Sequence, residues 1–380
     1  MTEGPIKSFD EDLYDRRPIV DRILKRIKSN NYNSLKGQTI VGDYGCGKTS
    51  LLNLIEGCID KKDNIIICKF DSWGRITDAQ QGQKLILEKI IEDIGKYTGV
   101  SDIKSVPKDY LNSLSGIDSR LKGIIDIINA TSLDTEKQLN KIDNTLKAIN
   151  KKLLVFIEDM DRNNNSEELA NDISPLLDRL VCVPNITFIF TIGYDTHISS
   201  IINRITNYRE DLVADDSSTE KLLMKFRELS INCIKEKTIN LDHIYESEIL
   251  KLQYSYKEAY NAIIFYTKNP RIAKYYLRAI YESWSGNLSG EVDFDDLLMI
   301  LLLKHCEPSA YDYLIKNIRK SNIKDKTEIE NSFKDNAEFF KNTDMASSLI
   351  IYILNNNNKF CINRPQSIAS CDNGDKKKTI

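Results

Sequence analysis

Dense apolar runs alternate, along the first two thirds of the chain, with stretches in which apolar residues recur every three or four positions. A short run of β-branched and aromatic residues is typical of a buried strand, and the longer period is typical of an amphipathic helix. Four runs predict strands, over residues 39–41, 64–70, 153–157 and 185–192. A fifth, shorter strand is expected over residues 229–234. Strands that alternate with helices predict an α/β fold with a doubly wound parallel sheet.

The helices expected around this sheet include one over residues 12–27, one over 85–94 and a helical pair within 100–150. Apolar residues in the last of these segments step by three and four for less than two heptads, which is too short for a coiled-coil seam. An antiparallel pair that packs on the core is expected there, with binding of a partner protein as the alternative.

Strand signals fade from residue 241 onward, and helical patterns take over. We therefore expect an α/β core over residues 1–240 with a helical insertion at about 100–150, then a helical lid domain over 241–320 and a weakly ordered tail over 321–380. One helix is expected inside that tail, around residues 345–354. Within the helical domain, Asn269 fits a helix N-cap and Pro270 the first turn that follows it.

The first strand and the helix after it enclose the spacing Gly-x-x-x-x-Gly-Lys-Thr, filled by Gly42, Gly47, Lys48 and Thr49. The glycines let successive backbone N–H groups turn toward one phosphate, and the helix presents its positive N-terminus to the same anion. Lys48 is expected to reach the β- and γ-phosphates, and the Thr49 hydroxyl to bind Mg²⁺. A glycine turn followed by a lysine by chance is the alternative, which the flanking strand and helix disfavour. The residues expected to bind the nucleotide are Gly42, Asp43, Tyr44, Gly45, Cys46, Gly47, Lys48, Thr49 and Ser50.

The strand over residues 153–157 is followed directly by carboxylates. Its apolar density predicts a place in the middle of the sheet, so the carboxylates emerge at the carboxyl edge, where the phosphate loop also lies. This is the arrangement of a Walker B element. By register we assign Glu158 to Mg²⁺ and Asp159 to the attacking water, although the usual metal ligand is Asp and the assignment is open by one position. Arg162 either pairs with Asp161 or supplies positive charge to the γ-phosphate of a neighbouring protomer.

Two further polar side chains are candidates for contact with the γ-phosphate. Thr191 lies near the end of the strand over residues 185–192, and Arg271 lies in the first turn of the helix that Pro270 begins. The alternative for Thr191 is a hydroxyl that the backbone satisfies. The alternative for Arg271 is an arginine in water at a helix start.

The composition disfavours several classes of function but identifies no binding partner. The formal net charge of −3 argues against a dominant nucleic-acid-binding surface. The eight cysteines show no Cys-x-x-Cys pair or zinc spacing, and with no secretory signal they are expected to be reduced thiols of a cytoplasmic protein. Cys46, inside the phosphate loop, either fills a variable position or has a pKa lowered by the helix N-terminus. No apolar run reaches the roughly 18 residues that span a bilayer.

Taken in order, these motifs resemble the KAP family of P-loop NTPases, a branch close to AAA+ and STAND proteins. Beyond the phosphate loop, the likeness rests on the segments at residues 70–73, 156–162, 190–195 and 269–271, and it covers roughly residues 10–315. Two features depart from the family. Many relatives insert transmembrane helices between the Walker elements, where residues 74–150 are polar here, and some relatives continue well beyond a segment like residues 364–368.

The resemblance implies a P-loop NTPase with a three-layer sheet core, ATP and Mg²⁺ as ligands, and Arg271 as a lid arginine that reads the γ-phosphate. It implies an ATP-hydrolysing switch in regulated assembly or signalling, with bacterial antiviral defence as one setting, and a second copy or a partner protein bound through the insertion and the lid. ATP rather than GTP rests on the resemblance and on the lack of an Asn-Lys-x-Asp element. Two alternatives stay open: a module that binds nucleotide without hydrolysis, which Glu158 and the short C-terminal part favour, and a small-molecule kinase, which the second acid and the helical lid disfavour.

Overall fold

The computed structural model describes eleven parts of the chain: residues 4–28, 37–71, 79–97, 135–159, 177–179, 181–194, 205–235, 257–285, 294–317, 331 and 342–358. The chain divides into two compact units, Met1–Val213 and Ala214–Ile380. The first unit is built around a sheet, and the described part of the second is helical. None of the described helices has the length and the apolar composition needed to cross a membrane.

The sheet confirms the expected α/β class and the four long strands. Its described strands are β1 (Gly37–Val41), β2 (Ile65–Asp71), β3 (Lys152–Glu158), β4 (Ile186–Ile192) and β5 (Tyr208–Asp211). They lie in the order β2-β3-β4-β1-β5, and every neighbouring pair is parallel. The strand that precedes the phosphate loop therefore lies between two strands that come much later in the sequence.

The fifth strand is not where the sequence pattern placed it. Residues 229–234 belong to α9 (Asp216–Lys235), and the strand is β5 instead. Residues 229–234 alternate between apolar and polar, but they continue a helix that begins at Asp216. The Asp215 side chain, directly before this helix, accepts a hydrogen bond from the Ser218 N–H at 2.7 Å. β5 has no apolar pattern, because its one buried side chain is Glu210. Glu210 forms ion pairs with Arg22 (2.7 Å) and Arg26 (2.8 Å) of α1.

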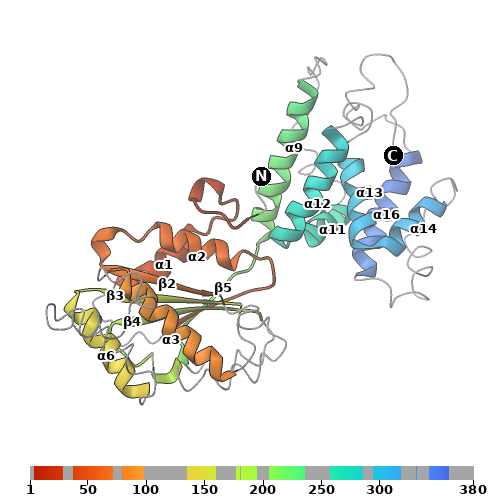
Figure 1. Cartoon of the computed structure of the whole chain (residues 1–380). Helices are drawn as coiled ribbons and strands as arrows, with labels where there is room; N and C mark the ends of the chain where they lie inside the picture. Colours follow the sequence, from red (N-terminus) through yellow and green to blue (C-terminus); the bar gives the residue numbers. More distant parts are fainter. Residues whose placement is uncertain are drawn as a thin grey trace. The chain divides into compact units, whose positions relative to one another are not determined.

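Helices cover both faces of the sheet, as Figure 1 shows. α1 (Arg17–Lys28) and α2 (Lys48–Gly57) lie on one face, and α3 (Ala79–Gly95) and α6 (Thr135–Ala148) lie on the other. Alternate residues of each strand enter the two apolar layers, because successive side chains of a strand point to opposite faces. On β3, for example, Phe156 packs in the layer under α1 and α2, whereas Ile157 packs in the layer over α3 and α6.

The segment before α1 is not helical, although the sequence predicted a helix from residue 12. The side chain of Asp12 accepts hydrogen bonds from the N–H groups of Tyr14 (3.2 Å) and Arg16 (2.6 Å). An aspartate that binds nearby backbone N–H groups in this way competes with the helix ladder, so α1 begins only at Arg17. Before this segment, Phe9–Glu11 form a short 3₁₀ helix.

The second unit packs a set of helices around its own apolar core. Besides α9, the described helices are α11 (Lys257–Thr267), α12 (Pro270–Ser283), α13 (Phe294–Cys306), α14 (Pro308–Asn317) and α16 (Thr343–Asn358). The predicted cap is confirmed, since the Asn269 side chain accepts from the N–H groups of Arg271 and Ile272. α16 contains the helix expected around 345–354, and its buried Leu349 and Ile350 make it part of the folded unit rather than of a weakly ordered tail.

The division between the units falls after Val213, whereas the sequence pattern suggested residue 240. The two boundaries differ because α9 belongs to the second unit, whereas the sequence pattern predicted a strand of the α/β core over residues 229–234. The helical insertion expected at about 100–150 is described only from residue 135, where α6 begins. Residues 100–134 lie outside the described residues.

Candidate phosphate-binding site

The loop after β1 turns into α2 through two glycines in the left-handed region. Gly45 has φ 85° and Gly47 has φ 100°, and Gly47 is the N-cap of α2. The Cys46 N–H donates to the Asp43 carbonyl at 3.2 Å and closes the turn between them. L side chains rarely adopt such a backbone, so glycine is required at both positions for this turn. The strand–loop–helix that the motif predicted is therefore present.

The base of the loop is held against neighbouring strands. The Gly42 N–H donates to the carbonyl of Ile192 in β4 at 3.1 Å. A Cβ atom at Gly42 would lie 2.6 Å from Cys46 Sγ and 2.9 Å from the carbonyl oxygen of Leu212. The first glycine of the motif is thus required by close packing rather than by an unusual dihedral angle.

Lys48 begins α2 and folds back over the loop. Its side chain is 8% exposed, and Nζ donates to the carbonyl oxygens of Gly42 (2.6 Å) and Asp43 (3.2 Å). The ammonium group and the N-terminus of α2 thus place positive charge at the same end of the loop. Together with the turned backbone, they make an arrangement of the kind that binds anions at helix N-termini.

The phosphate loop and the end of β3 meet through a direct hydrogen bond. Thr49 Oγ1 donates to Glu158 Oε2 at 2.7 Å, across 109 residues of sequence. Burial raises the pKa of Glu158, the Thr49 hydrogen bond lowers it, and the carboxylates of Asp159 and Asp71 raise it further. The net result is a carboxyl group that binds a proton more readily than an ordinary glutamate, because it is largely withdrawn from water and lies beside two other acids.

Three strands bring polar residues to the same edge and face of the sheet. Asp71 of β2 is the register partner of Glu158. Ile157 pairs with Phe190, so the next pair along is Glu158 with Thr191. Residues opposite each other in register point to the same face, which here is the face covered by α1 and α2. The sequence predicted this edge correctly for Glu158 and Thr191.

Two buried hydroxyl groups near this edge have no hydrogen-bond partner among the described residues: Thr191 Oγ1 and Tyr194 Oη. Thr191 is 1% exposed, so the alternative of a hydroxyl satisfied by the backbone is not what the structure shows. Burial raises the pKa of Tyr194, and the nearby acids Asp211 and Asp43 raise it further. Tyr194 therefore lies beside the phosphate loop, a placement that sequence reasoning missed.

An arginine from the segment before α1 also contacts the loop. Arg16 is 5% exposed, and its Nη2 donates to the Cys46 carbonyl at 2.9 Å. A Cβ atom on Gly47 would lie 2.3 Å from the same nitrogen. No sequence signal separates Arg16 from its neighbour Arg17, which is exposed. The contact is a tertiary one and was not predicted.

Cys46 is a packing residue of the loop. Its side chain is 7% exposed, and burial raises the pKa of its thiol more than Lys48 and Arg16 lower it. The alternative that the helix N-terminus lowers the pKa of this thiol is therefore wrong, because desolvation of the sulfur is the larger effect. The thiol stays protonated and fills a variable position of the motif.

The remaining candidates lie elsewhere. Arg162 falls outside the described residues. Arg271 is exposed in the first turn of α12, in the second unit. Ser50 is buried, and its hydroxyl accepts a hydrogen bond from the Ile6 N–H at 3.3 Å. Asp43 and Tyr44 lie at the exposed tip of the loop.

The donor set fits a hard cation. A threonine hydroxyl and a glutamate carboxylate supply oxygen ligands, which Mg²⁺ prefers, and Mg²⁺ is commonly held by one or two such groups together with phosphate oxygens and water. Among the described residues, no group of three or more His, Cys, Asp and Glu side chains is arranged to hold a metal ion. The hydroxyl of Thr49 and the carboxylate of Glu158 are donors of the kind that fit Mg²⁺.

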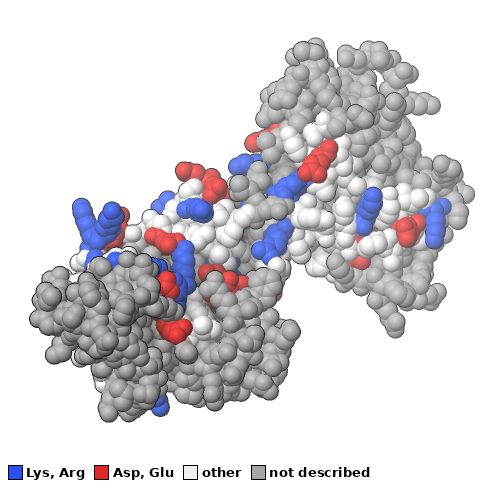
Figure 2. Space-filling model, viewed as in Figure 1, with Lys and Arg blue, Asp and Glu red and all other residues white. Residues whose placement is uncertain are grey.

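Figure 2 shows charged side chains of both signs on the described residues of one face. In the view of Figure 2, Lys and Arg side chains alternate with Asp and Glu side chains over both units. This agrees with the small net charge of −3 and marks no basic face among the described residues in that view.

Comparison with known proteins identifies one family. The model of the KAP family P-loop domain matches residues 16–280. No curated protein matches the chain. Two solved structures are similar at 12% identity: the structure of Drosophila ORC bound to DNA (TM-score 0.37, 90% of this chain and 81% of that chain) and the crystal structure of a DNA replication initiation factor (TM-score 0.32, 93% and 98%). At these scores neither likeness supports a conclusion about this chain.

Proposed function

The chain belongs to the KAP family of P-loop domains, and on that premise we propose that it binds ATP with Mg²⁺ and hydrolyses it as a molecular switch. One observation carries the proposal, namely the 2.7 Å hydrogen bond between Thr49 Oγ1 and Glu158 Oε2. These two groups come from distant parts of the sequence, and they are the oxygen donors that a P-loop NTPase brings to Mg²⁺.

Each residue at the loop has a role in this proposal. The backbone N–H groups of Gly45 and of residues 47–49 would hold the phosphates together with Lys48 Nζ, since the Cys46 N–H already donates to the Asp43 carbonyl. Thr49 and Glu158 would hold Mg²⁺. When bound, Mg²⁺ would stabilise the negative charge on the phosphate oxygens. Asp159 orients the attacking water and accepts its proton. Asp159 has φ 57°, so the chain turns directly after Glu158 and the two acids need not share one direction.

Three residues complete the proposal at the γ-phosphate. The Thr191 hydroxyl, buried without a partner among the described residues, is assigned to a γ-phosphate oxygen. Arg271 is assigned to the γ-phosphate on the family resemblance. Arg162 is assigned either to a pair with Asp161 or to the nucleotide of a neighbouring copy.

The first experiment is a steady-state phosphate-release assay on the wild type and on Asp159→Asn. Asparagine is the matched change because it also tolerates a positive φ and removes only the charge. We expect turnover by the wild type, at least a hundredfold loss in the variant, and retained ATP binding in both. Nucleotide bound by the wild type without phosphate release would instead make this chain a binding module, and transfer of phosphate to a small molecule would make it a kinase.

Lys48→Ala is the test of the site itself. Loss of this ammonium group should abolish ATP binding, and Lys25→Ala, at an exposed lysine of α1, serves as the control. If Lys48→Ala binds ATP as the wild type does, the phosphates lie elsewhere and the proposal fails.

The setting we propose is regulated assembly or signalling in the cytoplasm, of which bacterial antiviral defence is one case. Nucleotide state would then control association with a second copy or a partner protein through the helical insertion and the second unit. Size measurement with and without a non-hydrolysable ATP analogue tests this. A mass that does not change with the analogue would rule out self-association controlled by the nucleotide.

A further inference from the structure

We infer that Arg16 is a positioning residue for the phosphate loop, so that nucleotide binding and the ordering of the N-terminal segment, residues 6–16, are coupled. The inference rests on the proposed function. It concerns how the loop is held rather than which atoms react, and its evidence is the contact between Arg16 and the loop.

Arg16 contacts the phosphate loop where the loop turns into α2. Nη2 donates to the Cys46 carbonyl at 2.9 Å, and the guanidinium group lies against Gly47, where a Cβ atom would be 2.3 Å from Nη2 and 2.9 Å from Cζ. Gly47 is the N-cap of α2 with φ 100°, so the contact falls where the loop N–H groups must turn toward a phosphate. A loop already held in its binding conformation loses less conformational entropy when the ligand arrives.

Arg16 is itself fixed. The Asp12 carboxylate accepts from the Arg16 backbone N–H at 2.6 Å and lies 3.5 Å from Nη1. Both side chains are buried, at 6% and 3% exposure. Asp12 also neutralises the guanidinium charge, so Arg16 acts on the loop by geometry more than by attraction for the phosphates. Arg16 Nε is buried and has no hydrogen-bond partner among the described residues, and Arg16 Cζ lies 5.3 Å from the centre of the Tyr14 ring. Asp12, Tyr14 and the loop therefore orient this arginine together.

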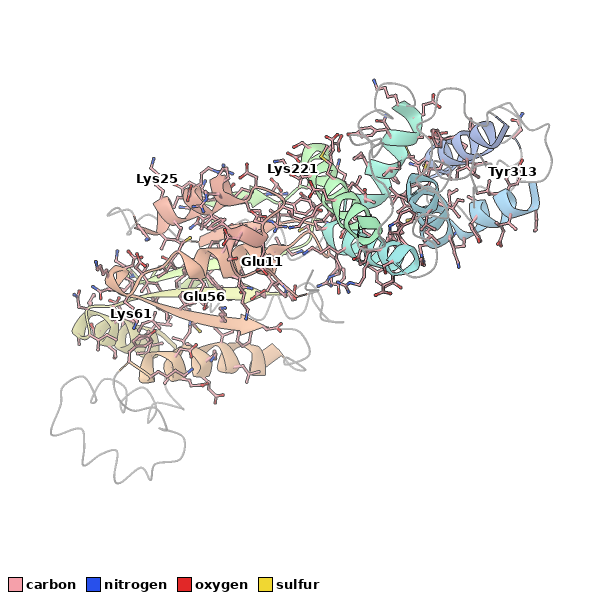
Figure 3. The ribbon with its side chains drawn as sticks, turned by 90° about the horizontal axis from the view of Figure 1, so that it is seen from above. Glu11, Lys25, Glu56, Lys61, Lys221 and Tyr313 are labelled. Atoms are coloured by element: carbon pink, nitrogen blue, oxygen red, sulfur yellow. The ribbon has the colours of Figure 1, made fainter. Side chains whose placement is uncertain are left out.

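The rest of the segment follows the start of α2. The Ile6 N–H donates to Ser50 Oγ at 3.3 Å, and Asn53 Nδ2 donates to the Ile6 carbonyl at 3.2 Å. Within the segment, the Lys7 N–H donates to the carboxylate of Glu11, which Figure 3 labels, at 3.0 Å. The segment therefore contacts the first turns of α2 at Ser50 and Asn53 as well as the loop at Cys46 and Gly47.

This arrangement makes a reciprocal prediction. If the segment holds the loop for ATP, then ATP must stabilise the segment by the same coupling free energy. The Ile6 and Arg16 amides, which donate to Ser50 and Asp12, are the reporters. Their hydrogen exchange should slow when ATP and Mg²⁺ bind the wild type.

The test compares Arg16→Lys with Arg22→Lys. Lysine keeps the charge that Asp12 needs, so the protein is expected to fold, but it cannot contact Asp12 and the Cys46 carbonyl through two separate nitrogens. We expect the Kd for ATP to rise about tenfold in Arg16→Lys, with kcat at saturating ATP unchanged within about twofold. The control changes an exposed arginine of α1 that pairs with Glu210 of β5, and it should leave Kd unchanged.

The outcomes separate this inference from the proposed function. An unchanged Kd in Arg16→Lys, a fall in kcat with no change in Kd, or ATP binding without protection of the Ile6 and Arg16 amides would each overturn it. If the wild type binds ATP without hydrolysis, the Kd comparison still decides. If the wild type binds no nucleotide, the proposed function fails and exchange at residues 42–49 without ligand decides, with faster exchange in Arg16→Lys supporting the inference and equal exchange overturning it.

Discussion

The two faces of the sheet are built from alternate residues of the same strands, and they differ at the carboxyl edge. Under α3 and α6, β3 and β4 end in the apolar residues Ile157 and Ile192. Under α1 and α2, Phe156 and Ile189 are equally apolar, but Glu158 and Thr191 follow them. The polar residues of the proposed site therefore occupy the last position of one face, while both faces contribute apolar packing.

The largest expected effect tests that shared stability. Phe156 lies on the α1/α2 face and Phe188 on the α3/α6 face, and both are 0% exposed. Replacing either by Ala should lower the unfolding free energy of the first unit by about 3–5 kcal/mol, because it removes buried apolar surface and leaves a cavity. Urea unfolding followed by circular dichroism measures both. A loss confined to one variant would show that the faces contribute unequally.

A smaller effect is expected from Glu158→Gln, and it depends on pH. The folded state raises the pKa of Glu158, so between the unfolded and folded pKa values the folded protein binds more protons and loses stability as pH rises. The uncharged variant avoids this loss. Without ligand it should melt a few degrees above the wild type at neutral pH, and the difference should vanish at a pH below the ordinary glutamate pKa.

The melting curves of Glu158→Gln have a functional counterpart. The same variant should weaken Mg²⁺-dependent ATP binding, since an amide is a poorer ligand than a carboxylate. A variant that melts lower than the wild type at neutral pH would contradict the raised pKa of Glu158 in the folded protein.

The smallest effect on stability is expected from a matched pair on β4. Thr187 and Thr191 are both buried on the α1/α2 face, and neither hydroxyl has a partner among the described residues. Valine at either position should change stability by no more than about 1 kcal/mol, toward greater stability, because no hydrogen bond is lost.

Activity should separate the members of this pair. Thr191 lies at the carboxyl edge beside Glu158, whereas Thr187 lies near the start of the strand. Thr191→Val should slow phosphate release at least tenfold, and Thr187→Val should not. Equal rates in the two variants would remove Thr191 from the proposed site.

Much of the fold follows from local pattern. The run at residues 153–157 is apolar at every position, which a strand in the sheet interior requires, and the structure places it between β2 and β4. The Gly42–Thr49 spacing fixes a strand–loop–helix because the turn needs glycine at defined positions. These features depend on a few neighbouring residues, so they can be predicted from the sequence.

The misses share one physical cause, which is contact that apolar spacing does not record. β5 exists because its backbone pairs with β1 and its Glu210 binds two arginines of α1, so its own side chains carry no strand pattern. Arg16 differs from Arg17 only through what it touches. The helix expected from residue 12 starts later because one aspartate binds the backbone.

The strand order has a consequence for synthesis. β1 leaves the ribosome early, yet its register partners in β4 and β5 come far later: Gly37 pairs with Phe188 and Gln38 with Tyr208. Contacts between residues so distant in sequence form late, since long loops must close first. β1, which precedes the phosphate loop, therefore stays unpaired on both edges until most of the first unit has been translated. Chains interrupted before residue 186 would expose that strand, and they are the ones we expect to aggregate.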